Sequence, residues 1–324
     1  MVSLDNIRLA RQRLEGIAVR TPILKYPRPI DGRTLFLKPE SLQPIGSFKL
    51  RGAYNKIASL SNEERRRGVI SYSSGNHAQG VAYAARAMGV NAVIVMPDNA
   101  PRIKRDGTAA LGAEIVTVGP ASSERKAKAE ELAQGHGFTI VPPYNDENII
   151  AGAASVGMEI IEDLPEVQAV LVPVGGGGLI SGTSAAVKLS RPDVKVIGVE
   201  PELANDAQRS FRSGHIVELS AQEVSRTVAD GLRTQSVGEI NFEHIRCYVD
   251  TIITVSEAEI LEAMRRLVTT AKLTAEPSGA VTTAAFMFHA AELPAVERTL
   301  AVISGGSVEP ELLARVLHDP AAPK

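Results

Sequence analysis

The chain is predicted to be an α/β protein in which mostly parallel sheets are flanked by helices. Three observations predict this class. Short β-branched runs alternate with amphipathic or alanine-rich helical segments along all 324 residues. Several of these runs are apolar throughout, as is typical of parallel strands buried on both faces. Polar or glycine-rich turns follow some of the strands, and open α/β sheets bind ligands beyond the carboxyl ends of their strands.

Nine strands are expected from the β-branched runs. They are residues 34–38, 69–73, 92–96, 114–118, 139–141, 169–174, 195–200, 251–255 and 299–303. The helical stretches between them include residues 76–88, 122–136, 256–272 and 278–290. Gly89 follows the first of these helices, where a C-terminal glycine cap is expected.

The composition excludes several classes of protein. Hydrophobic residues make up 44% of the chain and charged residues 22%, the balance of a globular protein with a sizeable core. A net charge of −2 gives no basic surplus for binding nucleic acid or an anionic membrane. No apolar run approaches the roughly 18 residues needed to span a bilayer. Cys247 is the only cysteine, so no internal disulfide is possible and a reducing cytoplasmic location is expected.

The first candidate motif is Gly-Ser-Phe-Lys-Leu-Arg-Gly at residues 46–52. Lys49 follows a Gly–Ser turn and precedes a helical stretch. A solvated lysine at a helix start has the same local pattern. The functional interpretation is an amine that condenses with an aldehyde and later moves protons.

The second motif is Ser-Ser-Gly-Asn-His at residues 73–77, between a strand and a helix. Its backbone N–H groups are placed to face an anion, helped by the helix dipole. Helix capping by serine and asparagine would explain the same residue types.

The third motif is a run of four glycines, residues 175–178, between an apolar strand and a helix. Each glycine costs about 0.5–1 kcal/mol in backbone entropy relative to alanine, so folding alone does not explain the run. Close approach of backbone amides to a phosphate would explain it, although a flexible turn is the alternative. The run lacks the Lys-Ser/Thr of a Walker loop and the spaced glycines of a dinucleotide fingerprint. A phosphorylated cofactor such as pyridoxal phosphate (PLP) is therefore a natural ligand.

Two further segments follow strands. Ser304-Gly305-Gly306 comes after the last strand, where a tight turn is the alternative to a binding loop. Glu200 and Asp206 flank a short acidic loop that contains Ala204. Two carboxylates and a backbone carbonyl suit a hard cation, although an acidic loop without metal has the same spacing.

Taken in order, these motifs resemble those of the fold-type II PLP enzymes, which have a tryptophan synthase β-like fold. The chain is most similar to the serine/threonine dehydratase (threonine ammonia-lyase) and serine racemase group. The resemblance runs from Arg20-Thr21-Pro22 to Ser304-Gly305-Gly306. It implies a soluble cytoplasmic enzyme that acts on a small amino acid, expected to be a homodimer.

The resemblance implies a role for each motif. Lys49 would carry PLP as the Schiff-base lysine and then remove the Cα proton. Ser74 matches the serine that acts on the opposite face in racemases. The implied cofactor-binding residues are Phe48, Lys49, Asn76, Gly175, Gly176, Gly177, Gly178 and Ser304. The implied substrate-binding residues are Ser73, Ser74, Gly75, Asn76 and His77. Glu200, Ala204 and Asp206 match a Mg²⁺ or Ca²⁺ site.

The implied function is the conversion of a β-hydroxy amino acid to a 2-oxo acid and ammonia. A serine at the pyridine nitrogen makes the ring a weak electron sink, so the carbanion should expel its β-leaving group promptly. The alternatives are a serine-racemase-type enzyme and a 3-hydroxyaspartate dehydratase. His77 argues against a cysteine-synthase-type enzyme, and the retained Lys49 argues against a protein that only binds a metabolite.

The sequence departs from the family pattern in one segment. Where relatives carry Ala-Gly-Gln-Gly-Thr, residues 151–155 read Ala-Gly-Ala-Ala-Ser. The resemblance places this segment near the active-site entrance, so Ala153 in place of glutamine is expected to admit a bulkier substrate such as 3-phenylserine. Two domains are expected: a large PLP-binding domain of residues 1–67 and 147–324, and a small mobile domain of residues 68–146.

Overall fold

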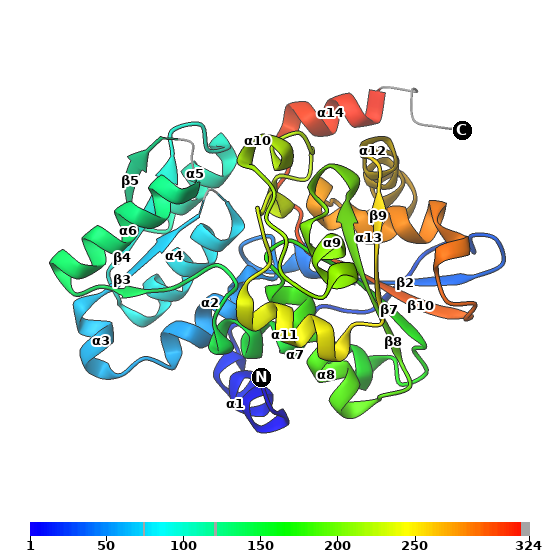
Figure 1. Ribbon diagram of the computed structural model, residues 1–324, viewed down its shortest axis with the longest axis horizontal. Helices are drawn as coiled ribbons and strands as arrows, with labels where there is room; N and C mark the ends of the chain where they lie inside the picture. Colours follow the sequence, from blue (N-terminus) through cyan, green and yellow to red (C-terminus); the bar gives the residue numbers. More distant parts are fainter. Residues whose placement is uncertain (74, 120–121, 319–324) are drawn as a thin grey trace.

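The computed structural model describes residues 1–73, 75–119 and 122–318, which form two sheets flanked by helices (Figure 1). The strands are β1 Leu24–Lys25, β2 Thr34–Pro39, β3 Val69–Tyr72, β4 Ala92–Pro97, β5 Glu114–Val118, β6 Thr139–Ile140, β7 Ala169–Pro173, β8 Lys195–Pro201, β9 Thr251–Val255 and β10 Arg298–Ile303. The α-helices are α1 Leu4–Leu14, α2 Lys49–Ala58, α3 Asn62–Arg67, α4 Asn76–Met88, α5 Arg102–Ala110, α6 Ser122–His136, α7 Glu147–Asp163, α8 Gly178–Ser190, α9 Asp206–Ser213, α10 Ala221–Val224, α11 Glu239–Tyr248, α12 Glu257–Arg266, α13 Pro277–Phe288 and α14 Pro310–His318. Short helical turns are η1 Glu40–Leu42, η2 Glu202–Ala204, η3 Asp230–Leu232, η4 Leu267–Ala271 and η5 Ala290–Glu292.

The larger sheet has six strands in the order β1-β2-β10-β7-β8-β9. All neighbouring strands are parallel except β1 and β2. Its strands are apolar on both faces, and consecutive side chains enter different cores. Leu171 packs into the core beneath α12 and α13, whereas Val170 packs into the core formed with α7 and α8. This period of two explains why the strand sequences are continuously hydrophobic.

The smaller sheet has four parallel strands in the order β5-β4-β3-β6, all drawn from residues 69–140. On one face, Val69 and Ile94 pack with alanines of α4 and with Ile57 of α2. This apolar cluster joins the small sheet to the rest of the molecule. The limits 1–67 with 147–324 and 68–146 for two domains stay a prediction.

All nine expected strands are present, with ends that differ by at most two residues from expectation. The two-residue strand β1 was not expected, because it is too short to give a periodic pattern. The expected helix 256–272 is instead two elements, α12 and the wider turn η4, which ends at Lys272 in a left-handed conformation. Gly89 is the left-handed cap of α4, with φ of 64°.

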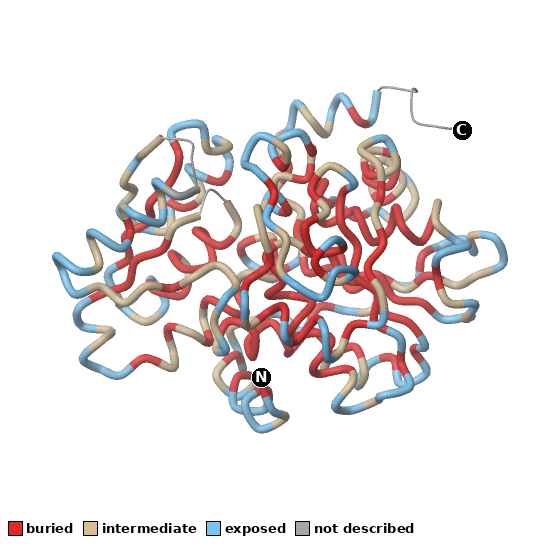
Figure 2. Tube along the Cα trace, viewed as in Figure 1, coloured by how far each residue is buried: buried red, intermediate tan, exposed pale blue. Residues whose placement is uncertain are grey.

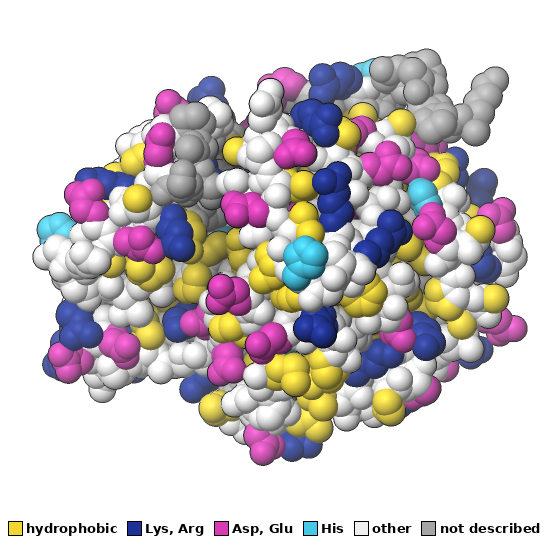
Figure 3. All heavy atoms as spheres, viewed as in Figure 1, with side chains coloured by type: hydrophobic (Ala, Val, Ile, Leu, Met, Phe, Trp, Pro, Cys, Tyr) yellow, Lys and Arg dark blue, Asp and Glu magenta, His cyan; other side chains and the backbone are white. Residues whose placement is uncertain are grey.

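The buried residues gather in and around the six-stranded sheet, as the red segments of Figure 2 show. No helix among the described residues is long and apolar enough to cross a membrane. The face in Figure 3 carries interspersed positive and negative side chains, which agrees with the net charge of −2.

Candidate active site

Lys49 is the first residue of α2, and the segment before it pairs with the segment that follows β10. Ser47 and Gly305 form a β-bridge. The N–H of Phe48 donates to the carbonyl of Ser304 at 3.0 Å. The lysine motif and the Ser-Gly-Gly motif, which are far apart in the sequence, therefore meet at the carboxyl edge of the large sheet.

The Lys49 amine points to the segment that precedes α7. Its Nζ donates to the carbonyl of Pro143 at 2.7 Å. Burial lowers the pKa of Lys49 to about 8, because a low-polarity environment disfavours the ammonium form. An amine with this pKa is partly neutral near pH 7, which suits it to attack an aldehyde carbon.

Arg51 anchors the helix that carries Lys49. Its guanidinium is 1% exposed and pairs with Glu40 and Glu159, each at 2.7 Å. Lys38 pairs with the same Glu159 at 2.6 Å. Burial alone would lower the pKa of Arg51, but the two carboxylates raise it above its usual value. This buried network connects α2 with β2 and α7 and fixes the start of α2.

The glycine run connects β7 to the N-terminus of α8. Gly177 has φ of 95° and caps the helix, a conformation that favours glycine. A Cβ on Gly176 would collide with the ring of Tyr144. Among the described residues, none accepts a hydrogen bond from the N–H groups of the four glycines. Unpaired amides at a helix N-terminus are a site for an anion such as a phosphate.

The 73–77 loop lies beside this centre. Asn76 begins α4, and its Nδ2 donates to Glu276, while its buried Oδ1 has no partner among the described residues. The N–H of Gly75 donates to Ser73 Oγ at 3.3 Å. Ser74, the candidate for the second catalytic group, lies outside the described residues.

Comparisons with known proteins identify the family. A family model described as "Pyridoxal-phosphate dependent enzyme" matches residues 14–305. The chain belongs to the pyridoxal-phosphate-dependent enzyme family. It is 42% identical to the L-threonine ammonia-lyase of Thermotoga maritima, over 98% of this chain and 79% of that protein.

Two other relatives broaden the comparison. The chain is 39% identical to the L-threo-3-hydroxyaspartate ammonia-lyase of Saccharomyces cerevisiae, over 95% of this chain and 94% of that protein. The solved structure of maize serine racemase is similar with a TM-score of 0.91 and 32% identity, covering 98% of this chain and 97% of that chain. The fold is therefore that of the fold-type II PLP enzymes.

The residues present fit the cofactor of this family. The four glycine amides offer unpaired donors for the phosphate, and Lys49 offers an amine with a lowered pKa. Asn76 has an unsatisfied oxygen and one amide hydrogen not used by Glu276. Ser304 is 5% exposed, and its hydroxyl donates to the Ser278 carbonyl at a long 3.3 Å, so the hydroxyl can turn to another acceptor.

His77 lies behind the loop and is buried. Burial and the neighbouring Lys49 lower the pKa of His77 to about 3, so its ring is neutral. Its Nε2 lies 3.0 Å from the Val141 carbonyl, so that nitrogen carries the hydrogen. Nδ1 then has only a lone pair and no partner among the described residues. The ring of His77 therefore has no free hydrogen-bond donor to offer to a substrate carboxylate.

Two residues beside the site carried no signal in the sequence. Glu276 caps α13 and accepts from Asn76, and its own N–H donates to the Gly305 carbonyl at 3.0 Å. Lys104, from α5, pairs with Glu276 at 3.1 Å. An isolated Glu or Lys has no local pattern that separates it from a surface residue. The Glu-Pro start of α13 is the one feature that could have drawn attention to Glu276.

The acidic pair Glu200 and Asp206 is buried, and Ala204 lies between them in the chain. Glu200 accepts from the N–H groups of Ala207 and Gln208, at 3.1 and 2.7 Å. The Asp206 carboxylate is met by backbone N–H groups of Asp206 itself and Val237, and no side chain among the described residues donates a hydrogen bond to it. Burial raises the pKa of Asp206 to about 8, and burial together with Asp206 raises the pKa of Glu200. No cluster of three or more His, Cys, Asp or Glu suited to a metal occurs in the described part of the chain. The assignment of Glu200, Ala204 and Asp206 to a Mg²⁺ or Ca²⁺ ion stays a prediction.

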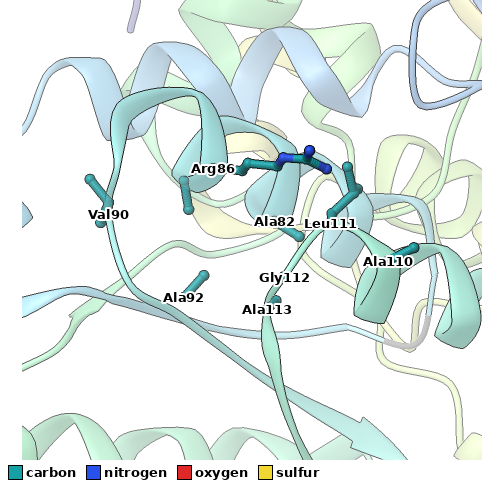
Figure 4. A pocket seen from close by; sticks show the side chains of 9 residues that line it. Ala82, Arg86, Val90, Ala92, Ala110, Leu111, Gly112 and Ala113 are labelled. Atoms are coloured by element: carbon teal, nitrogen blue, oxygen red, sulfur yellow. The ribbon is translucent and has the colours of Figure 1, made fainter.

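Two observations bear on ligand access. Ala153 is 1% exposed within α7, so it does not line an open entrance, and the expectation of extra space at this position finds no support. A cavity of about 310 Å³ lies between α4, β4 and the end of α5 (Figure 4). Its lining is mostly alanine with Arg86, and it includes none of the candidate site residues.

Proposed function

We propose that this chain is a PLP-dependent ammonia-lyase that converts a β-hydroxy amino acid to a 2-oxo acid and ammonia. The observation that carries the proposal is the position of Lys49. Its low-pKa amine meets Pro143, while the next residue, Tyr144, covers the glycine loop. The names of the ammonia-lyase relatives support the reaction type.

PLP, when bound, supplies an electron-withdrawing ring that stabilises negative charge at the substrate Cα. Lys49 would hold its aldehyde carbon through Nζ, and the amides of Gly175, Gly176, Gly177 and Gly178 would hold its phosphate. Asn76 would bind its 3-hydroxyl, Phe48 would pack on the ring, and Ser304 would face the ring nitrogen.

The protein's own groups would then divide the proton transfers. Once free, Lys49 Nζ would take the proton from the substrate Cα, because a pKa near 8 lets it act as a base near neutral pH. The N–H groups at the start of α4, in the 73–77 loop, would orient the substrate carboxylate. The β-hydroxyl needs a proton to leave as water, and a protonated group near the cofactor phosphate would supply it.

The His77 ring is neutral and Lys49 is desolvated, so each hydrogen bond to a bound carboxylate would be strengthened by the low local dielectric. Serine and threonine are the first substrates to test. 3-Hydroxyaspartate tests whether the site accepts a charged side chain. 3-Phenylserine tests whether the site accepts a large one.

The experiment is an assay of ammonia and 2-oxo acid release from serine, threonine, 3-hydroxyaspartate and 3-phenylserine. Wild-type protein with PLP should release both products in equal amounts from at least one of them. Lys49→Ala should abolish release and the visible absorbance of bound PLP while the circular dichroism stays unchanged. Lys126→Ala, on the exposed face of α6, is the matched control and should be fully active.

A racemase is the second candidate, favoured by the similarity to maize serine racemase. It requires Ser74 as the acid–base group opposite Lys49. Chiral analysis of recovered substrate decides between the two, because a pure lyase leaves no opposite enantiomer. Ser74→Ala should impair one substrate enantiomer much more than the other if the serine acts on one face.

Further features belong to the same proposal. A Mg²⁺ or Ca²⁺ ion would be held by Glu200, Asp206 and the Ala204 carbonyl, since the two carboxylates are buried and each raises the cost of ionising the pair. A cytoplasmic homodimer is proposed, as is a small domain of residues 68–146 that moves over the substrate.

A further inference from the structure

Lys104 is a buried cation shared by two carboxylates. Its side chain is 2% exposed, and Nζ lies 2.6 Å from Asp230 and 3.1 Å from Glu276. Burial alone would lower the pKa of Lys104, but the two carboxylates raise it above its usual value. Lys104 therefore stays charged, and a buried charge is tolerated only while its partners remain in place.

The pairing joins two separate parts of the molecule. Lys104 lies on α5, which follows β4 of the four-stranded sheet. Asp230 is in η3, and Glu276 caps α13, which packs on the six-stranded sheet. A second contact reinforces the first: the N–H of Ile103 donates to Glu309 at 3.2 Å. Two carboxylates thus meet the Lys104 ammonium, and a third accepts from a backbone N–H in the first turn of α5, where the helix dipole favours negative charge.

The contact of α5 with η3 and α13 differs in kind from the contact of α4 with α2. Where α4 meets α2, the packing is apolar and continuous, through Ala78, Val81, Ala53 and Ile57. At α5 the junction consists of ion pairs and a hydrogen bond to carboxylates. The apolar junction depends on side-chain packing, whereas the junction at α5 depends on a buried charge that is stable only while its carboxylate partners stay in place.

The Lys104 side chain also lies close to Gly75, next to Asn76. A Cβ placed on Gly75 would lie 3.1 Å from Lys104 Cδ. Glu276, the partner of Lys104, accepts the amide hydrogen of Asn76. Lys104 therefore lies beside Gly75, and its ammonium group is linked to Asn76 through the single carboxylate of Glu276.

Loss of the ammonium would change Glu276. Burial and the charge of Asp230 already raise the pKa of Glu276, and Lys104 opposes that increase. Without Lys104, Glu276 would take up a proton and could donate to Asn76 instead of accepting from it. The side-chain amide of Asn76 would then rotate, so that its oxygen would face Glu276 in place of its N–H.

We propose that Lys104 is a positioning residue, which holds α5, Gly75 and Asn76 against η3 and α13 and keeps Asn76 oriented for the cofactor. This inference rests on the proposed function. It adds a residue that acts through Glu276 and Asp230 without touching the reacting atoms.

The test compares Lys104→Met with Arg102→Met. Methionine keeps the apolar stem of Lys104 and removes the charge. Arg102 is two residues earlier on α5, and its side chain is 85% exposed, so it is the matched control. In protein without PLP, Lys104→Met should raise amide hydrogen exchange about tenfold in residues 102–110 and 75–79. Exchange in α7 and α8 should not change, and Arg102→Met should behave as wild type.

The cofactor gives a second readout. PLP affinity should fall about tenfold in Lys104→Met, and the visible absorption band of bound PLP should shift because the contact with Asn76 changes. The kcat should fall more than KM rises, since Asn76 acts on the cofactor and not on substrate capture. A residue with only a structural role would lower thermal stability without shifting the band.

Asp230→Asn is the second variant if Lys104→Met fails to fold. The substitution removes the shorter ion pair and keeps the side-chain size. Hydrogen exchange and PLP affinity should change in the same direction as in Lys104→Met, by a smaller factor. Unchanged exchange and an unchanged PLP band in both variants would overturn the proposal. A wild-type protein that releases no ammonia would contradict the proposed function alone, because the exchange measurement needs no substrate.

Discussion

Lys49 donates a 2.7 Å hydrogen bond to the backbone carbonyl of Pro143, the residue before the tyrosine that covers the glycine loop. One short segment thus contacts both the amine that would bind an aldehyde and the amides that would bind a phosphate. Since a carbonyl can accept from either a neutral or a charged amine, the contact orients Nζ without fixing its protonation state.

The rate of PLP capture by the cofactor-free protein should depend on pH through Lys49. Only the neutral amine attacks, and burial lowers its pKa from 10.5 to about 8. The rate should therefore rise about tenfold per pH unit below 8 and level off above it. Stopped-flow absorbance measures this rate. A midpoint near 10.5 would show that Lys49 is solvated and would remove the basis for its activation.

Gly176→Ala should weaken PLP binding and destabilise the protein. The added methyl group would collide with the Tyr144 ring, and overpacking of this kind costs about 1–3 kcal/mol. The free energy of unfolding and the PLP dissociation constant measure the two effects. Gly135→Ala, at an open position in α6, is the control: it should leave PLP affinity unchanged and raise the free energy of unfolding by about 0.5–1 kcal/mol. A Gly176→Ala protein with normal affinity would contradict the close approach of Tyr144 to the loop.

His77 should remain neutral from pH 5 to pH 9, with its hydrogen on Nε2. Burial first, and the charge of Lys49 second, lower its pKa to about 3. The imidazole chemical shifts of His77 from NMR should not change across this range. A His77 resonance that titrates near pH 6 would mean that the ring reaches solvent.

Divalent cations should stabilise the protein through Asp206. Two buried carboxylates close in the chain repel each other, and a cation would compensate both. At about 100 times the dissociation constant, Mg²⁺ or Ca²⁺ should add about 2.7 kcal/mol to the free energy of unfolding. EDTA should reverse the effect.

Asp206→Asn should abolish this stabilisation, and Asp5→Asn, at an exposed position of α1, should retain it. Equal cation responses in these two variants would place the ion elsewhere.

The sequence predicted the strands, the α/β class and the order of the binding motifs. The strands were predictable because period-two burial leaves continuous apolar runs such as 169–173. Gly89 was predictable because a left-handed helix cap has a strong local preference. The glycine run was recognisable because four adjacent glycines are costly without a ligand.

Other parts of the site had no local pattern. Asn76 and Glu276 are 200 residues apart, and Lys104 and Asp230 are 126 apart. Neither pair has a spacing that a helix or strand would impose. The short strand β1 and the division of residues 256–272 into α12 and η4 also depended on neighbours in space, not on sequence period.

By itself the sequence determined the elements and the motifs, because backbone preferences and burial periodicity act over a few neighbouring residues. Only the tertiary structure decided that Lys49 is partly desolvated, that the His77 ring is neutral and that Lys104 joins the two parts of the molecule. Desolvation and ion pairing depend on which distant segments pack against a group, and that is set when the sheets and helices come together.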